Sequence, residues 1–514
     1  MIRKIKRKLA AWKERRSLAR QRRDNLSASN EDERKAFIEG LREIERVFGD
    51  VSQSQVEAVD VSVRMNADIP QLAWICERKG SAYRFEIGRS VEVFRNGFFE
   101  GVWPGDFADL SSVITSISFG SGVVLGTGLP CFIQRKDGRE FTFILRRKSD
   151  GVDIISNSIC FCLARSGINP DEAFFKSIAD KLVDTTHTAT AQGVHRYDPV
   201  VAEDDNYVLY RLFYANFRIS SDGAVTFEKD FFGRSYRDYQ EYHSFLVDTT
   251  RRVFENAMHP GRKIQLPPVA TVSTGYDSVG VAAIAKECGC EDAITLGVTV
   301  YGHDDSGTAV AQALGMNLRS FDHVAGSVVD GLVMDVAQVD FDVAKEFIAT
   351  AGIGDDVTFA SFEEALENRT LLSGVGGDGS WDIACDGQLG IPVSIRFAKS
   401  TTEFRLRVGY AHYPPIVASS MSQRDIAKLS VSPEMKPFSI GGTYDRPIPR
   451  RIAEEAGVPR EAFGQKKAAT SPDFRDAQRL WEAAAVSVME RYRPGRNLVD
   501  VDMTTSADTA SRAR

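Results

Sequence analysis

An alternation of apolar strand-like and helix-like segments between residues 269 and 324 is the feature that most constrains how this chain folds. The segments in order are strand Val269–Val272, helix Val279–Glu287 closed by Gly289, strand Ala293–Val300, helix Ser306–Leu314 closed by Gly315, and a strand near Leu318–Val324. Alternation at this spacing predicts a parallel sheet with helices on its faces. In such sheets ligands bind beyond the carboxyl ends of the strands.

The turn between the first strand and the first helix is Ser273-Thr274-Gly275-Tyr276-Asp277-Ser278, here called the first loop. Its small residues let the backbone approach an anion, and the free N–H groups of a helix start attract phosphate. Asp277 would repel phosphate unless a divalent cation lay between them, so the turn predicts Mg²⁺ as well. It lacks the lysine of the GxxxxGK[ST] loop of P-loop NTPases.

The first loop resembles the SGGxDS pyrophosphate loop of the PP-loop ATP pyrophosphatases, and most of all that of the synthetase domain of asparagine synthetases. Three further segments resemble that family over roughly residues 240–470. They are Leu371–Gly379, similar to a second phosphate-side loop; Asp305 with Ala309–Gly315; and Glu403–Arg407 with Tyr444–Lys467, similar to a late region that ends in a basic residue near the pyrophosphate. We call Ser373–Asp382 the second loop.

The resemblance implies a doubly wound parallel α/β sheet of the adenine nucleotide alpha hydrolase kind, with ATP and Mg²⁺ as cofactors. It also implies a reaction in which a carboxylate is adenylated, pyrophosphate leaves, and ammonia or an amine then forms an amide. Catalysis of the first step is mostly neutralisation of charge on the departing pyrophosphate.

Residue roles also follow from the resemblance. The pyrophosphate would contact Ser273, Thr274, Gly275, Tyr276, Asp277 and Ser278, together with Gly377, Asp378 and Gly379 of the second loop. Backbone groups of Gly297 and Val298 would contact adenine, and Lys466 or Lys467 would be the catalytic cation. The metal would be held by Asp277 and Asp382.

Two positions depart from the family pattern. Thr274 stands where the family usually has glycine, which costs little only if its φ is negative. Trp381 stands where a metal-side carboxylate is expected, leaving Asp382 beside it. Either Asp382 supplies the second metal contact, or one metal is bound differently, or adenylation is impaired.

The amino-terminal half has a different pattern of apolar residues. Short alternating runs broken by Gly, Asn and Asp between about residues 56 and 238 predict a β-rich α+β domain. We interpret it as a relic of the glutaminase domain of asparagine synthetases. Those enzymes use a cysteine at position 2, whereas this chain begins Met1-Ile2-Arg3, so we expect no glutaminase activity. The expected organisation is an arm (1–24), the β-rich domain (25–238), the ATP-binding domain (239–493) and a loose tail (494–514).

Composition places the chain in the cytoplasm. Its 514 residues are 43% hydrophobic and contain seven cysteines, which is sparse for a disulfide framework. The net charge is −7, yet residues 1–23 carry eleven Lys and Arg against Glu14 alone. An acidic body makes general nucleic-acid binding unlikely. The arm has helical apolar spacing, which fits an anionic membrane face, including peripheral association at the inner face. The simpler interpretation, which the short apolar stripe favours, is a solvated basic helix that packs on the acidic body or binds RNA.

The acceptor is expected to be a small-molecule or glycan carboxylate other than aspartate, and a homo-oligomer is left open. Two alternatives remain. One is sulfur transfer to RNA, which requires a reactive cysteine near the site, for which Cys385 is the candidate. The other is a nucleotide-binding scaffold that has lost catalysis, which Trp381 favours.

Overall fold

The structure is a computed structural model. It describes residues 27, 29–49, 58–136, 140–168, 176–178, 181, 196–298, 304–323, 333–334, 341–350, 356–383, 401–442, 444–465, 473–474, 477–492, 498–501 and 503. The predicted basic arm (1–24), the catalytic candidates Lys466 and Lys467, Cys385 and most of the predicted tail lie outside the described residues.

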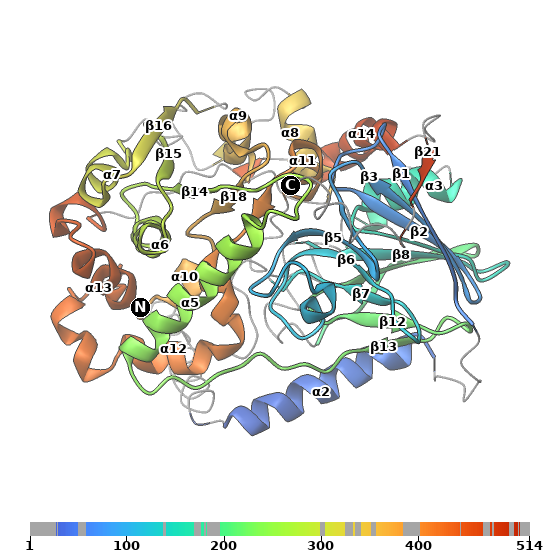
Figure 1. Ribbon diagram of the computed structural model, residues 1–514, viewed down its shortest axis with the longest axis horizontal. Coiled ribbons are helices and arrows are strands. Elements are labelled where there is room, and N and C mark those ends of the chain that lie inside the picture. Colours follow the sequence, from blue (N-terminus) through green and yellow to red (C-terminus); the bar gives the residue numbers. More distant parts are fainter. Residues whose placement is uncertain are drawn as a thin grey trace, which may run out of the picture.

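A five-stranded sheet, in which every neighbouring pair is parallel, confirms the predicted parallel sheet (Figure 1). Its spatial order is β16-β15-β14-β18-β19. The chain therefore starts at the centre, steps outward twice, and then returns to add β18 on the other side of β14. The strands are β14 (Pro268–Thr271), β15 (Asp292–Leu296), β16 (Asn317–Phe321), β18 (Thr370–Leu372) and β19 (Ala411–His412). The reversal between β14 and β18 is the place where open parallel sheets bind ligands.

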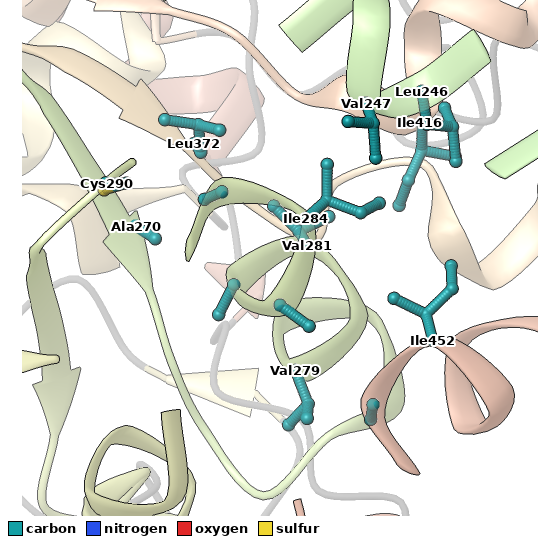
Figure 2. Packing of buried hydrophobic residues seen from close by; sticks show 14 of the residues in the cluster. Leu246, Val247, Ala270, Val279, Val281, Ile284, Cys290, Leu372, Ile416 and Ile452 are labelled. Carbon is teal, nitrogen blue, oxygen red and sulfur yellow. The ribbon is translucent and has the colours of Figure 1, made fainter. Parts of the chain in front are cut away.

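Helix α6 (Tyr276–Glu287) follows β14, and its central residues, Val279–Ala285, are all buried (Figure 2). Val279, Val281 and Ile284 belong to one buried cluster with residues of α5 (Tyr239–Ala257) and α13 (Pro447–Glu455). Burying a side chain of this size contributes roughly 1.5–3 kcal/mol. This packing fixes the helix whose first turn carries the first loop.

The amino-terminal half is β-rich, as the alternating runs predict, and its strands form a sandwich of two mainly antiparallel sheets (Figure 1). Its core is aromatic, with ring centroids 6.0 Å apart for Trp74 and Phe98 and 4.9 Å apart for Phe132 and Phe217. One sheet contains β10 (Val200–Glu203), β11 (Tyr207–Leu212), β8 (Thr142–Arg147), β9 (Asp153–Ser156), β2 (Trp74–Lys79), β3 (Ala82–Gly88), β1 (Asp60–Asn66) and β21 (Leu498–Asp500). The other contains β13 (Val225–Phe227), β12 (Phe217–Ile219), β7 (Cys131–Ile133), β6 (Phe119–Val124), β5 (Gly97–Val102) and β4 (Glu92–Phe94).

Further helices surround these sheets. They are α2 (Asn30–Val47), α3 (Ile159–Ser166), α7 (Thr308–Leu314), α8 (Phe341–Ile348), α9 (Glu363–Leu366), α10 (Gly377–Ser380), α11 (Thr402–Val408), α12 (Gln423–Ser430) and α14 (Ala477–Met489). A small parallel pair joins β17 (Val333–Met334) to β20 (Asp473–Phe474). Among the described residues, none of the helices combines the length and apolar character needed to cross a lipid bilayer.

The two predicted domains share a packed interface. One buried cluster contains Ile75 and Phe161 of the amino-terminal half together with Val269 and Phe404 of the other half. Within this interface the guanidinium of Arg405 binds the carboxylates of Glu100 and Glu140 at 2.6–2.9 Å. The segment Glu403–Arg407, expected near the pyrophosphate, therefore helps to join the two halves.

The end of the chain differs from the expected loose tail. Leu498–Asp500 forms β21, which pairs antiparallel with the edge strand β1. An edge strand offers a row of unpaired backbone groups, which a short exposed segment can satisfy. A short part of the 494–514 segment is thus tied to the sandwich.

Candidate functional site

The first loop forms a compact bend between β14 and α6. The hydroxyl oxygens of Ser273 and Ser278 lie 2.7 Å apart, and the Gly275 N–H donates to Ser273 Oγ at 3.1 Å. Gly275 is the N-cap of α6 and has no side chain to bond the N–H groups of the first turn. Such a helix start favours an anion, because its N–H groups and the helix dipole both point toward it.

Thr274 is held by Asp305, the acidic residue expected after the second strand. Its N–H and its hydroxyl both donate to Asp305 Oδ1, the N–H at 3.1 Å. Burial raises the pKa of Asp305, and the two bonds from Thr274 oppose that rise. Thr274 does not adopt a positive φ, so the replacement of glycine carries no backbone strain. Its hydroxyl instead gains a partner that glycine would lack.

The second loop packs directly against the first. A Cβ atom added to Gly374 would lie 2.6 Å from Ser278 N, and one added to Gly377 would lie 2.2 Å from Asp277 Cγ. Both distances are far shorter than a van der Waals contact, so only glycine allows this approach. The glycines of the second loop therefore let two helix starts meet at the carboxyl edge between β14 and β18.

Arg446 joins the acidic side chains of both loops. Its guanidinium donates to Asp277 of the first loop and to Asp378 of the second, and its Nε lies 3.8 Å from Asp382 Oδ2. The Arg446 side chain is only 2% exposed. Burial alone would lower the pKa of Arg446, but the charges of Asp277 and Asp378 more than offset this and raise it. Arg446 stays charged at any ordinary pH.

Sequence reasoning missed Arg446. It singled out the late region Tyr444–Lys467 but placed the cation at its end, on Lys466 or Lys467, which lie outside the described residues. A local sequence signal marks the position of Arg446 at the start of a helix, because Arg446 directly precedes Pro447, the first residue of α13. Proline is typical of the first helical position, so Arg446 is fixed at a helix start.

The expected Mg²⁺ ligands can be tested against this geometry. Carboxylate oxygens such as those of Asp277, Asp378 and Asp382 are the ligands that Mg²⁺ prefers, so the donor chemistry fits. Within the described ranges, however, no three His, Cys, Asp or Glu side chains are grouped so that they could hold a metal ion. The guanidinium of Arg446 lies among the three carboxylates instead.

Two residues that were expected at the site have side chains in the protein core. Tyr276 is buried beside Tyr444 and Phe463, and its hydroxyl accepts a hydrogen bond from Arg450. Only the backbone of Tyr276 can therefore face a phosphate. Trp381 is also buried, and its Nε1–H donates to the Tyr242 hydroxyl at 2.9 Å. Trp381 therefore packs in the core and offers no metal ligand at this position.

The segment after β15 contains the adenine candidates. The predicted strand Ala293–Val300 ends at Leu296, so Gly297 and Val298 lie just beyond it. Gly297 already uses both backbone groups: its N–H donates to Phe321 and its carbonyl accepts from Asp305, each at 3.4 Å. The Val298 side chain is 39% exposed and gives an apolar surface at the same edge of the sheet. Val298 is thus the better placed of the two for a flat, apolar group.

The described site therefore brings together the first loop, the second loop, Asp305 and Arg446 at the carboxyl edge of the parallel sheet. Neither a scan against models of known protein families nor a search among curated protein sequences finds a match for this chain. The geometry of these loops is thus what indicates a function.

Proposed function

We propose that this chain is an ATP-dependent ligase that adenylates a carboxylate and then forms an amide with ammonia or an amine. The observation that carries the proposal is the contact of the first loop with the glycine-rich second loop at the point where the strand order reverses, with Gly377 packed on Asp277. This arrangement, together with the resemblance of the first loop to the SGGxDS sequence, favours a site for the phosphates of a nucleotide. We propose a doubly wound arrangement for this domain on the same grounds.

In the proposed first step a carboxylate oxygen of the substrate attacks the α-phosphorus of ATP. The bond between the α-phosphorus and the bridging oxygen breaks, and pyrophosphate leaves with the electron pair. The N–H groups at the start of α6 and the guanidinium of Arg446 would stabilise its negative charge. Mg²⁺, when bound with Asp277 and Asp382, would supply further positive charge. An amine then attacks the acyl carbon, AMP leaves, and the nitrogen loses a proton.

Chemistry based on cysteine has little support among the described residues. The thiols of Cys76, Cys131, Cys160, Cys162 and Cys290 are buried, and Cys288 is partly buried. Burial raises the pKa of each of these thiols, which makes it a poor nucleophile. Cys385, the candidate for sulfur transfer, lies outside the described residues. We favour ammonia or an amine as the attacking group and keep sulfur transfer as the second candidate. The scaffold that has lost catalysis is the third candidate, and the exchange test below distinguishes it from the ligase.

The test is exchange of labelled pyrophosphate into ATP in the presence of a panel of small carboxylic acids and sugar acids. We expect exchange that depends on one class of acid and that falls by about 10²-fold or more in Asp277→Asn. Asp292→Asn is the matched control, because Asp292 starts β15 at the opposite edge of the sheet and binds Arg369. Exchange that is equal in Asp277→Asn and in the wild type would reject the proposal.

A further inference from the structure

A pocket of about 560 Å³ lies beside α5 at the junction of the two halves, and we call it the α5 pocket. Its other walls include residues 115–117 of the sandwich and residues 231–236, which lead from the sandwich to α5. A volume of this size is typical of sites for small molecules. The opposite face of α5, with Tyr242 and Leu246, packs in the buried cluster around α6, so α5 lies between the pocket and α6. The residues of α5 that line the pocket are Glu241, Ser244, Phe245, Asp248, Thr249 and Arg252.

Two arginine side chains line the α5 pocket without a carboxylate partner. Arg234 and Arg252 are exposed, and within the described part of the chain neither guanidinium forms an ion pair or a hydrogen bond. The two acidic side chains of the pocket are instead bound by arginines that do not line it. The pocket therefore has a surplus of positive charge, which favours an anionic ligand. The bound acids are Glu241, which accepts from Arg237 Nε at 3.0 Å, and Asp248, which accepts from Arg251 Nη1 at 3.0 Å.

The main chain of Arg234 is fixed while its guanidinium keeps free donors. The Arg234 N–H donates to Ser422 Oγ at 2.9 Å, and a Cβ atom added to the preceding Gly233 would lie 2.9 Å from the carbonyl oxygen of Met421. The guanidinium lies 5.0 Å from the centre of the Phe245 ring. An arginine over an aromatic ring can still donate from the edge of its guanidinium to an anion.

The wall of the α5 pocket also contains a polar group without a partner. Thr249 is 8% exposed, and its hydroxyl has no hydrogen bond among the described residues. A buried hydroxyl that lacks a partner is uncommon, because burying it costs free energy. Phe231, Tyr236 and Phe245 supply aromatic rings around the same space. An anion that carries a flat ring would satisfy the hydroxyl and cover the aromatic surface.

We propose that the α5 pocket binds a small organic anion in which a phosphate or carboxylate group is attached to a flat ring. Arg234 and Arg252 attract the anionic group, because hydrogen bonds between a guanidinium and an oxyanion are stronger than those between neutral groups. Thr249 donates to an oxygen of the ligand, and the aromatic residues contact its ring. This site is distinct from the proposed nucleotide site, since α5 separates it from α6, and it does not depend on the ligase activity.

The test is isothermal titration calorimetry of the full chain with phenyl phosphate, benzoate and the uncharged benzyl alcohol as probes. We expect saturable binding of at least one of the two anions, the tighter of which identifies the preferred group, and no binding of benzyl alcohol at the same concentration. The affinity should fall at least about tenfold in Arg234→Met and in Arg252→Met, because each variant loses a charged hydrogen bond. Both side chains are exposed, so the variants should fold as the wild type does.

Thr249→Val and Arg42→Met complete the set of variants. Thr249→Val keeps the shape of the side chain but removes its hydroxyl, so the affinity should fall by roughly 3–10-fold. Arg42→Met is the matched control, because Arg42 is an exposed arginine of α2 that does not line the pocket, and it should bind the probes as the wild type does. Equal binding in the wild type and both variants of the pocket arginines would place the anion elsewhere and overturn the proposal. Failure of both anions to bind the wild type at millimolar concentration would overturn it as well.

Discussion

Gly377 lies so close to Asp277 that one added methyl group should separate the two loops. We predict that Gly377→Ala weakens nucleotide binding by about tenfold or more and destabilises the protein by about 1–3 kcal/mol, as overpacking does. Nucleotide titration and urea denaturation measure the two effects. Gly126→Ala is the control, because nothing lies within 4 Å of a Cβ at that position. Equal nucleotide affinity in the two variants would show that the contact between the loops is not needed for binding.

At the scale of single residues, the sequence predicts which residues lie in the loops but not where their side chains point. Asp305 meets Thr274 as expected from its place after the second strand. Tyr276 and Trp381 turn into the core, because each finds a polar partner there that no local pattern predicts. Arg446 is about 170 residues from Asp277, so only the fold reveals their contact.

At the scale of elements, α2 docks on α12 through a buried acid with a raised pKa. Glu33 lies 3.1 Å from Arg424, and burial raises the pKa of Glu33 to about 7 from 4.5, with Arg424 opposing and Asp425 adding to the rise. Because the folded state holds this proton more tightly than the unfolded state, the contribution of Glu33 to stability is fully present below about pH 4.5 and is lost as the pH rises through about 7.

We predict that this contribution to the free energy of unfolding falls by on the order of 1–3 kcal/mol between about pH 5 and about pH 8. Glu33→Gln should remove it, so that the difference in stability between wild type and variant changes with pH. Urea denaturation across that range measures the difference. Glu43→Gln, an exposed position on the same helix, should keep the wild-type profile. Identical profiles for all three proteins would contradict the raised pKa.

Long elements with a clear pattern are the predictable ones. Helix α5 (Tyr239–Ala257) is such an element, because its buried positions recur at helical spacing. The predicted strand Ala293–Val300 is shorter, since apolar residues continue past the last parallel pairing at Leu296. Strand β21 has only three residues, all of them exposed, so no alternation of buried and exposed positions marks it, and its pairing with β1 is a contact over more than 400 positions of sequence.

At the scale of the whole molecule, two predicted domains form one packed body. Arg405 on α11 binds Glu100 and Glu140 from the other half, and all three side chains are buried. Removing one member of such a network is costly, because it leaves a buried charge without a partner. The sequence shows a change of pattern near residue 239 but cannot show that the two halves share a core, because the contacts join residues about 300 positions apart.

The most direct test of the central claim is amide hydrogen exchange with and without Mg²⁺ and a non-hydrolysable ATP analogue. If the two loops bind the phosphates, amide exchange should slow at residues 273–278 and 374–379 together, while the exchange rates in the aromatic core of the sandwich stay unchanged. Protection confined to other parts of the chain, or none at all at a saturating nucleotide concentration, would contradict the account.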